Sequence, residues 1–195
     1  MTIRAGIVGV QGDVAEHATA IERAASRHDL AVETCEIRSA GIVPDCDILA
    51  IPGGESTTIS RLVHGEGIAP EIVDHVEQGK PVLATCAGLI LASRDANDDR
   101  VEPLGLLDVT VDRNAFGRQR ESFETALEVK GIDDPFPAVF IRAPAIRSVG
   151  RDVEVLATHE DRIVAVREGP VIGTAFHPEL AGVFDVHDLA FFGDA

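Results

Sequence analysis

Short apolar runs rich in β-branched residues alternate with helical stretches through the first half of this chain. Apolar side chains recur at helical spacing from Val14 onward and again over about 68–78. A strand covered on both faces needs a continuous apolar run, and parallel strands need a crossover between them. The predicted strands lie at 3–10, 31–37, 47–51 and 81–85. This half predicts βαβ units and a mostly parallel sheet with helices on both faces.

The pattern changes after about residue 94. Residues 95–102 are polar and acidic, and the β-rich pieces that follow are too close together for helices to fit between them. These pieces are 106–111, 123–129, 139–141, 154–158, 162–167 and 171–175. Hairpins need only short links, so antiparallel pairing is expected here. With a closing helix at 186–192, residues 1–195 predict a single α/β domain whose second half is β-rich.

The charge balance limits the partners of the chain. It has 17 Lys and Arg against 33 Asp and Glu, a net charge of −16, and only two of the cations are lysines. Nucleic acid and anionic membranes are bound through clustered cations, and the sequence contains no basic run. A hydrophobic share of 45% places this charge on a folded surface. An acidic, lysine-poor surface favours adaptation to high salt over an ordinary acidic protein.

The three cysteines, Cys35, Cys46 and Cys86, are an odd number without Cys-x-x-Cys spacing, which fits neither a disulfide framework nor a zinc site. The sequence shows neither a secretory leader nor an apolar run of about 18 residues, so we expect a cytoplasmic protein in a reducing compartment. Cys35 and Cys46 lie in or before a strand, and we expect both to be packing residues.

Cys86 has a different setting. It follows the strand at 81–85 and precedes Ala87 and Gly88 at the start of a helix, which is the order of a nucleophile elbow. A helix N-terminus favours the thiolate, and the N–H of the next residue faces the oxygen of the group that the sulfur attacks. A buried, inert cysteine is the alternative, and the strand–turn–helix context argues against it.

Two more loops follow strands at the edge where open parallel sheets bind ligands. Residues 52–58 read Pro-Gly-Gly-Glu-Ser-Thr-Thr, in which Ser56 or Thr57 can cap the next helix, although a plain tight turn has the same pattern. His177 and Glu179 follow the last strong strand and project to the same side of an extended segment.

His177 and Glu179 complete a possible Cys–His–Glu triad with Cys86. The other six histidines lack metal-ligand spacing and are expected to be solvated or to cap helices. They are His17, His28, His64, His75, His159 and His187.

Three motifs resemble the class I, or triad, glutamine amidotransferases: residues 52–58, Thr-Cys-Ala-Gly-Leu-Ile at 85–90 and Phe-His-Pro-Glu at 176–179. Further stretches are similar to one family among them, the glutaminase subunits of pyridoxal 5′-phosphate synthase. These stretches are 9–17, 104–119, 139–144 and 185–187, in order along nearly the whole chain. The runs at 113–119 and 140–144 are the specific ones, because many amidotransferases share the elbow and the His-Pro-Glu.

The resemblance implies a three-layer, flavodoxin-like fold and hydrolysis of L-glutamine to L-glutamate and ammonia. It implies that Cys86 is the nucleophile, His177 the general base and acid, and Glu179 the carboxylate that orients the imidazole. Backbone N–H groups of Gly54 and Ala87 would hold the oxyanion. The implied L-glutamine-binding residues are Gly54, Glu55, Ser56, Arg113, Ile141 and Arg142.

The resemblance also implies a partner, a barrel-shaped synthase subunit that receives the ammonia through a tunnel. No metal or cofactor is expected on this chain. Three alternatives stay open: a glutaminase domain of another class I amidotransferase, a stand-alone peptidase-like cysteine hydrolase, and a non-catalytic α/β scaffold. The run at 113–119 argues against the first, Arg113 and Arg142 argue against the second, and an intact triad argues against the third.

Overall fold

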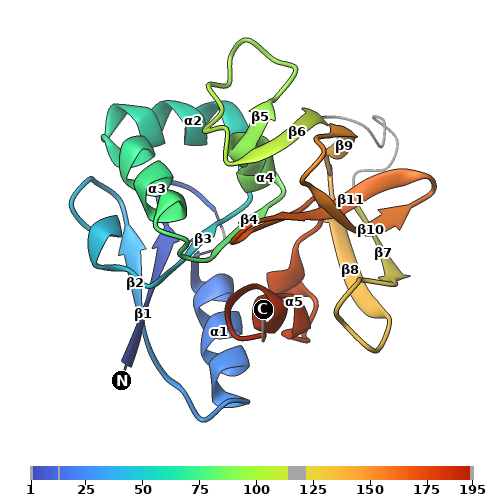
Figure 1. The fold of residues 1–195 in the computed structure, drawn as a ribbon, viewed down its shortest axis with the longest axis horizontal. Coiled ribbons are helices and arrows are strands. Elements are labelled where there is room, and N and C mark those ends of the chain that lie inside the picture. Colours follow the sequence, from blue (N-terminus) through green and yellow to red (C-terminus); the bar gives the residue numbers. More distant parts are fainter. Residues whose placement is uncertain (1, 13, 114–121, 194–195) are drawn as a thin grey trace.

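The computed structural model describes residues 2–12, 14–113 and 122–193 (Figure 1). Within these residues ten strands form one sheet, in which β10 pairs with β11 and the remaining strands follow the order β2-β1-β3-β4-β12-β11-β9-β6-β5. The first five strands of this order are mutually parallel, which gives the expected flavodoxin-like core. They are β1 (Thr2–Val8), β2 (Ala31–Ile37), β3 (Ile48–Ile51), β4 (Val82–Thr85) and β12 (Val171–Thr174).

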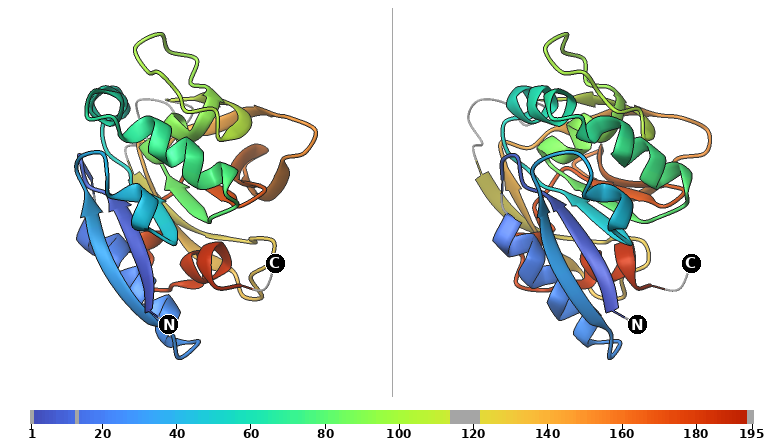
Figure 2. Two further views of the ribbon diagram at one scale, coloured as in Figure 1. Left: turned by 60° about the vertical axis from the view of Figure 1, so that its left-hand side comes forward. Right: turned by 90° about the vertical axis from the view of Figure 1, so that its left-hand side faces the viewer.

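Helices cover both faces of this core, as Figures 1 and 2 show. Because the sheet is covered on both sides, the central strands β3, β4 and β12 are buried at every residue. One face carries α1 (Val14–Ser26) and α5 (Asp185–Phe191), and the other carries α2 (Ser56–Gly65), α3 (Ile68–Glu77) and α4 (Ala87–Ala92). None of the helices in the described ranges is long and apolar enough to cross a membrane.

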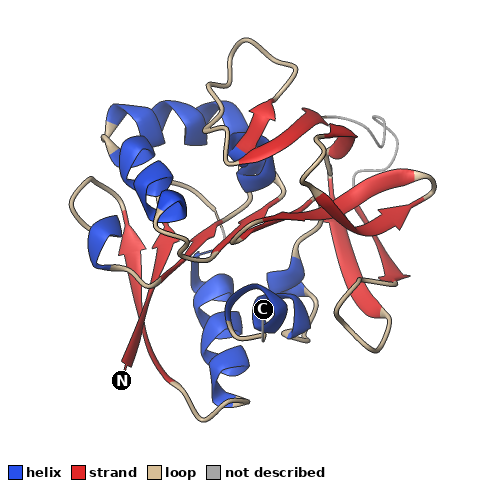
Figure 3. Ribbon diagram, viewed as in Figure 1, coloured by secondary structure: helices blue, strands red, loops and turns tan. Residues whose placement is uncertain are grey.

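The second half is rich in strands, as expected (Figure 3). Antiparallel pairs join β11 (Arg162–Glu168) to β10 (Glu154–His159), β12 and β9 (Ala145–Val149), and join β9 to β6 (Leu107–Asp112). A separate antiparallel hairpin consists of β7 (Ser122–Leu127) and β8 (Phe136–Ile141). The sequence did not predict β9 or β5 (Ser93–Asp95), which pairs in parallel with β6.

The helix after the 52–58 loop begins differently from the sequence prediction. Its N-cap is Glu55, whose carboxylate accepts hydrogen bonds from the backbone N–H groups of Thr57 and Thr58, at 3.2 and 2.8 Å. The expectation that Ser56 or Thr57 is the cap is therefore wrong. Cap preferences favour small polar residues, so a glutamate is not the first choice from sequence. The predicted start of α1 at Asp13 lies outside the described residues.

An aromatic cluster joins the β7–β8 hairpin to the chain that leaves β12. The ring of Phe176 lies 5.7 Å from that of Phe136 and 5.6 Å from that of Phe140, and all three residues are buried. The next residue, His177, donates its backbone N–H to Val139 O at 2.8 Å. The hairpin therefore holds the His177 segment over the sheet edge at which β4 ends.

Candidate functional site

Cys86 lies at the sharp turn between β4 and α4. Its backbone has φ 51° and ψ −105°, a conformation that non-glycine residues rarely adopt, and its N–H bonds to Thr174 O of β12 at 2.8 Å. Gly88 lets α4 pack directly on the end of β3, because a Cβ there would lie 2.0 Å from Ile51 O. The structure thus has the elbow geometry that the sequence predicted.

His177 and Glu179 are buried and hydrogen-bonded to each other. The Nδ1–H of His177 donates to Glu179 Oε1 at 2.7 Å, and the residues are 5% and 7% exposed. Pro178–Leu180 form a short 3-10 helix with His177 as its N-cap, so the expected extended segment is wrong beyond His177. A proline suits the first position of a helical turn, and this turn carries the carboxylate to the imidazole.

The environment of His177 favours its protonated form. Burial lowers the pKa of the imidazole, but side-chain hydrogen bonds with Cys86 and Glu179 outweigh that effect and raise it to about 10. An imidazolium beside a thiol favours the thiolate. Gly53 permits this approach, because a Cβ there would lie 2.5 Å from His177 Cε1 and 3.4 Å from Cys86 Cβ. Cys86 and His177 therefore lie side by side at Gly53.

A cleft of about 510 Å³ opens beside Cys86. It brings together every residue that the sequence assigned to the site except Glu179, which holds His177 from behind. The lining residues are Gln11, Gly54, Glu55, Ser56, Cys86, Ala87, Ile90, Arg113, Ile141, Arg142, Pro144 and His177.

Gln11, Ile90 and Pro144 line this cleft without having been predicted as site residues. Gln11 accepts a hydrogen bond from the backbone N–H of Glu55 at 3.1 Å. The sequence could have indicated Gln11 as a site residue, because it follows β1 at the same edge of the sheet as the other site loops.

Arg113 and Glu55 face each other across the cleft. One Arg113 nitrogen bonds to Asp98, and the other lies 3.3 Å from Glu55 Oε1. Hydrogen bonds, chiefly from the Thr58 side chain, lower the pKa of Glu55 to about 2, and those from Arg100 and then Arg113 lower the pKa of Asp98. The guanidinium is thus held between two carboxylates, with which a ligand carboxylate would compete.

Ile141 ends strand β8 and Arg142 follows it, and both residues line the cleft. The carbonyl oxygen of Ile141 lies 3.9 Å from Cys86 Sγ, and Arg142 is exposed with φ 43°. The specific run at 113–119 extends from Arg113 into residues that lie outside those described. Only its first residue can therefore be placed at the site.

Three of the histidines that were expected to be solvated or to cap helices are fully buried instead. His17, His75 and His187 are at most 2% exposed, so the expectation is wrong for them. For His17 the sequence held a signal, because His17 falls on the same helical face as Val14 and Ile21. The two other cysteines pack as expected: both are free thiols, and their sulfurs are 3.8 Å apart.

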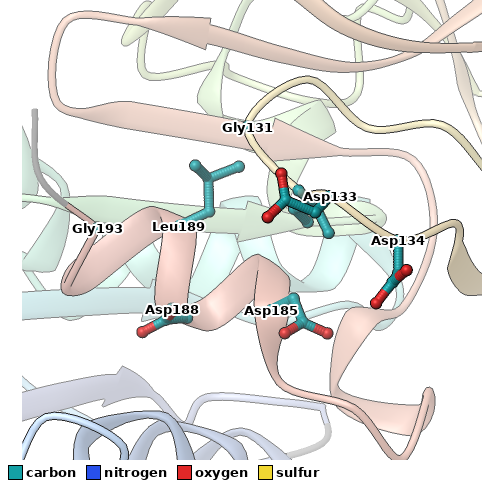
Figure 4. Close-up of a pocket in the computed structure, with 8 residues that line it drawn as sticks. Gly131, Asp133, Asp134, Asp185, Asp188, Leu189 and Gly193 are labelled. Atoms are coloured by element: carbon teal, nitrogen blue, oxygen red, sulfur yellow. The ribbon is translucent and has the colours of Figure 1, made fainter.

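A second pocket, of about 300 Å³, lies between the 131–134 loop and α5 (Figure 4). Its carboxylates are those of Asp133, Asp134, Asp185 and Asp188. Asp185 pairs with Arg27 at 2.6 Å, and Asp188 pairs with His28 at 2.5 Å. No group of three or more His, Cys, Asp or Glu side chains in the described ranges is arranged to hold a metal.

Comparison with known proteins gives consistent matches along the chain. The model of the SNO glutamine amidotransferase family matches residues 7–192. The pyridoxal 5′-phosphate synthase subunit PdxT of Haloarcula marismortui is 68% identical over 98% of both chains, and that of Archaeoglobus fulgidus is 53% identical over 96% of both. A crystal structure described as a glutamine amidotransferase superposes with a TM-score of 0.83 at 40% identity, over 95% of this chain and 96% of that one.

Proposed function

This chain belongs to the SNO glutamine amidotransferase family, and we propose that it hydrolyses L-glutamine to L-glutamate and ammonia for pyridoxal 5′-phosphate synthesis. The observation that carries the proposal is Cys86 at a strained elbow, beside the His177 imidazole that Glu179 holds in turn. Six relatives at 64–68% identity are named as the same synthase subunit, which favours this pathway over those of other class I amidotransferases.

The reaction begins with attack of the Cys86 thiolate on the carboxamide carbon of glutamine. Because His177 Nδ1 is engaged with Glu179, its Nε2–H is the proton available to the leaving nitrogen. The C–N bond breaks, ammonia departs, and a γ-glutamyl thioester remains on the sulfur. His177 then takes a proton from water, which attacks the thioester, so that glutamate leaves and the thiol is restored.

Backbone N–H groups of Gly54 and Ala87 are assigned to the oxyanion. Ala87 is the first residue of α4, where N–H groups lack helical partners. Gly54 has φ 143°, which only glycine adopts readily. One such donor is typically worth about 3–4 kcal/mol in the transition state.

The charged groups of the cleft suit a zwitterion. Arg113 can grip the α-carboxylate with two N–H groups, and Arg142 stands at the same mouth. The Glu55 carboxylate and the Ile141 carbonyl oxygen are acceptors for the α-ammonium, and Ser56 lies beside them. A peptidase-like hydrolase has no need of this arrangement for a free amino acid.

The proposed partner is a barrel-shaped synthase subunit that receives the ammonia in the cytoplasm, and no cofactor is assigned to this chain. The name of the relatives supports a multi-subunit synthase. Relatives from halophilic archaea support the expectation of high-salt adaptation that the net charge of −16 suggested.

Glutamate formation by the purified chain tests the proposal, alone and with the synthase subunit of the same cell, at low and high salt. Cys86→Ala should abolish turnover, and the matched thiol variant Cys35→Ala should retain it, because Cys35 lies on β2, away from the cleft. Turnover that survives Cys86→Ala, or its absence in every combination with the wild-type chain, would contradict the proposal.

A further inference from the structure

A row of buried side chains continues behind the triad. Glu179 Oε1 accepts from His177, and His17 Nε2 lies 3.4 Å from the other oxygen, Oε2. His17 Nδ1 lies 3.1 Å from Nε2 of His187. The side chains of Glu179 and His17 are fully buried, as is His187. The row therefore runs from the active site into the layer between α1 and α5.

Proton placement along this row follows from the acceptors. A carboxylate only accepts, so we place the proton of His17 on Nε2, which lies between Glu179 Oε2 and Thr85 Oγ1, at 3.4 and 3.2 Å. His17 Nδ1 is then an acceptor, and His187 must donate to it from Nε2. This leaves His187 Nδ1 as a bare lone pair, in agreement with its having no hydrogen-bond partner among the described residues. Every N–H of the row then has an acceptor.

The alternative tautomer is less favourable. With the proton on Nδ1, His17 would present its Nε2 lone pair to the carboxylate oxygen in a site without solvent, which is repulsive. Glu179 Oε2 has no hydrogen bond of standard geometry from any described residue, so its charge depends on the nearby His17 N–H group. Burial lowers the pKa of His17 and of His187 to about 3, so both rings are neutral and do not protonate the carboxylate.

We propose that His17, held by His187, is a positioning residue of the triad that fixes Glu179 from the side opposite His177. The inference rests on the proposed function and deepens it. It also assigns a role to two stretches of the family resemblance, 9–17 and 185–187, that the reaction steps leave unused. Without the His17 N–H, the Glu179 carboxylate in this buried site turns away from His177 or takes up a proton. Both changes destabilise the protonated form of His177.

Turnover with the synthase subunit present is the first test. His17→Leu should lower kcat by about 10- to 100-fold with little change in KM, the size expected when a buried carboxylate loses one partner. His17→Gln places an amide N–H near the same point and should recover kcat to within about fivefold of wild type. His75→Leu is the matched control, because His75 is also buried but lies on α3, away from the cleft.

A double-variant cycle separates positioning from folding. In a Glu179→Gln background, His17→Leu should have almost no further effect on kcat, because the group that it positions is already gone. A full additional loss in that background would show that His17 acts independently of Glu179 and would overturn the inference. An unchanged kcat for the folded single variant His17→Leu would overturn it too.

Alkylation of Cys86 by iodoacetamide tests the positioning role of His17 without relying on glutamine turnover. The rate, followed by peptide mass mapping, reports the thiolate that the imidazolium stabilises, so His17→Leu should slow it by about 3- to 10-fold and His17→Gln should restore it. Equal rates in wild type and His17→Leu would overturn the inference. If the wild-type chain makes no glutamate but His17→Leu still slows alkylation relative to wild type, the proposed function is refuted and the role of His17 is supported.

Discussion

The close approach of α4 to β3 gives a sharp test of how the elbow is built. A Cβ at Gly88 would lie 2.0 Å from Ile51 O, 2.8 Å from Ile51 C and 3.1 Å from Pro52 O. All three atoms belong to the backbone and cannot turn aside as a side chain could. Gly88→Ala must therefore push the first turn of α4 away from the sheet, and that turn carries the Ala87 N–H next to Cys86.

The expected change in the free energy of unfolding of Gly88→Ala follows from two opposing effects. Overpacking costs about 1–3 kcal/mol, and this backbone contact places Gly88→Ala near the upper value, whereas alanine recovers about 1 kcal/mol of helix propensity. The free energy of unfolding should therefore fall by about 2 kcal/mol, which lowers Tm by about 4–8 °C for a chain of this size. A displacement of about 1 Å at the elbow should also reduce kcat by about 100-fold.

Gly65→Ala is the matched control, because Gly65 lies in α2 with nothing within 4 Å of its Cβ position. It should raise the free energy of unfolding by about 0.5–1 kcal/mol and leave glutaminase turnover unchanged. Thermal unfolding and glutamate formation on both variants provide the measurement. If Gly88→Ala melts at or above the wild-type temperature with full turnover, packing of α4 on β3 does not set the elbow.

Three further predictions concern protons, salt and substrate. The folded-state pKa of His17 and His187 is about 3 against an ordinary 6.5, so unfolding takes up protons and the free energy of unfolding should fall as the pH drops from 6.5 towards 3. His17→Gln should reduce that slope by about one proton in urea titrations, and an unchanged slope would contradict the assignment. Raising the ionic strength from about 0.1 M to about 1 M shortens the screening length from about 10 to about 3 Å and should raise Tm; a level or falling Tm would contradict this. Arg113→Lys should raise KM for glutamine about tenfold with kcat within about threefold, and an equal loss in kcat would argue against a binding role.

Strong local patterns made the core and the elbow predictable. The strands β3 and β4 appear as short apolar runs because both of their faces are buried, and Cys86 follows β4 directly. In contrast, β5 is a three-residue strand at the sheet margin, too short to show a period. Its pairing with β6 comes from tertiary packing and leaves little trace in the sequence.

The parts of the site that sequence reasoning missed depend on contacts between distant elements. His17 and His187 are 170 positions apart and meet only because α1 and α5 share one face of the sheet. The helical spacing of His17 indicated a buried position but not its partner. Glu55 was assigned to the substrate from the family resemblance, and its second role as the cap of α2 requires the observed backbone turn at Gly54.

Covalent labelling tests the central claim, that Cys86 is the nucleophile of a glutamine-specific cleft. The chain is incubated with a diazo-ketone analogue of glutamine, with the synthase subunit present, and its peptides are mapped by mass spectrometry. A single adduct is expected on Cys86, prevented by excess L-glutamine and strongly slowed by His177→Ala. Labelling of Cys35 or Cys46 at an equal rate, or labelling of Cys86 that glutamine does not prevent, would contradict it.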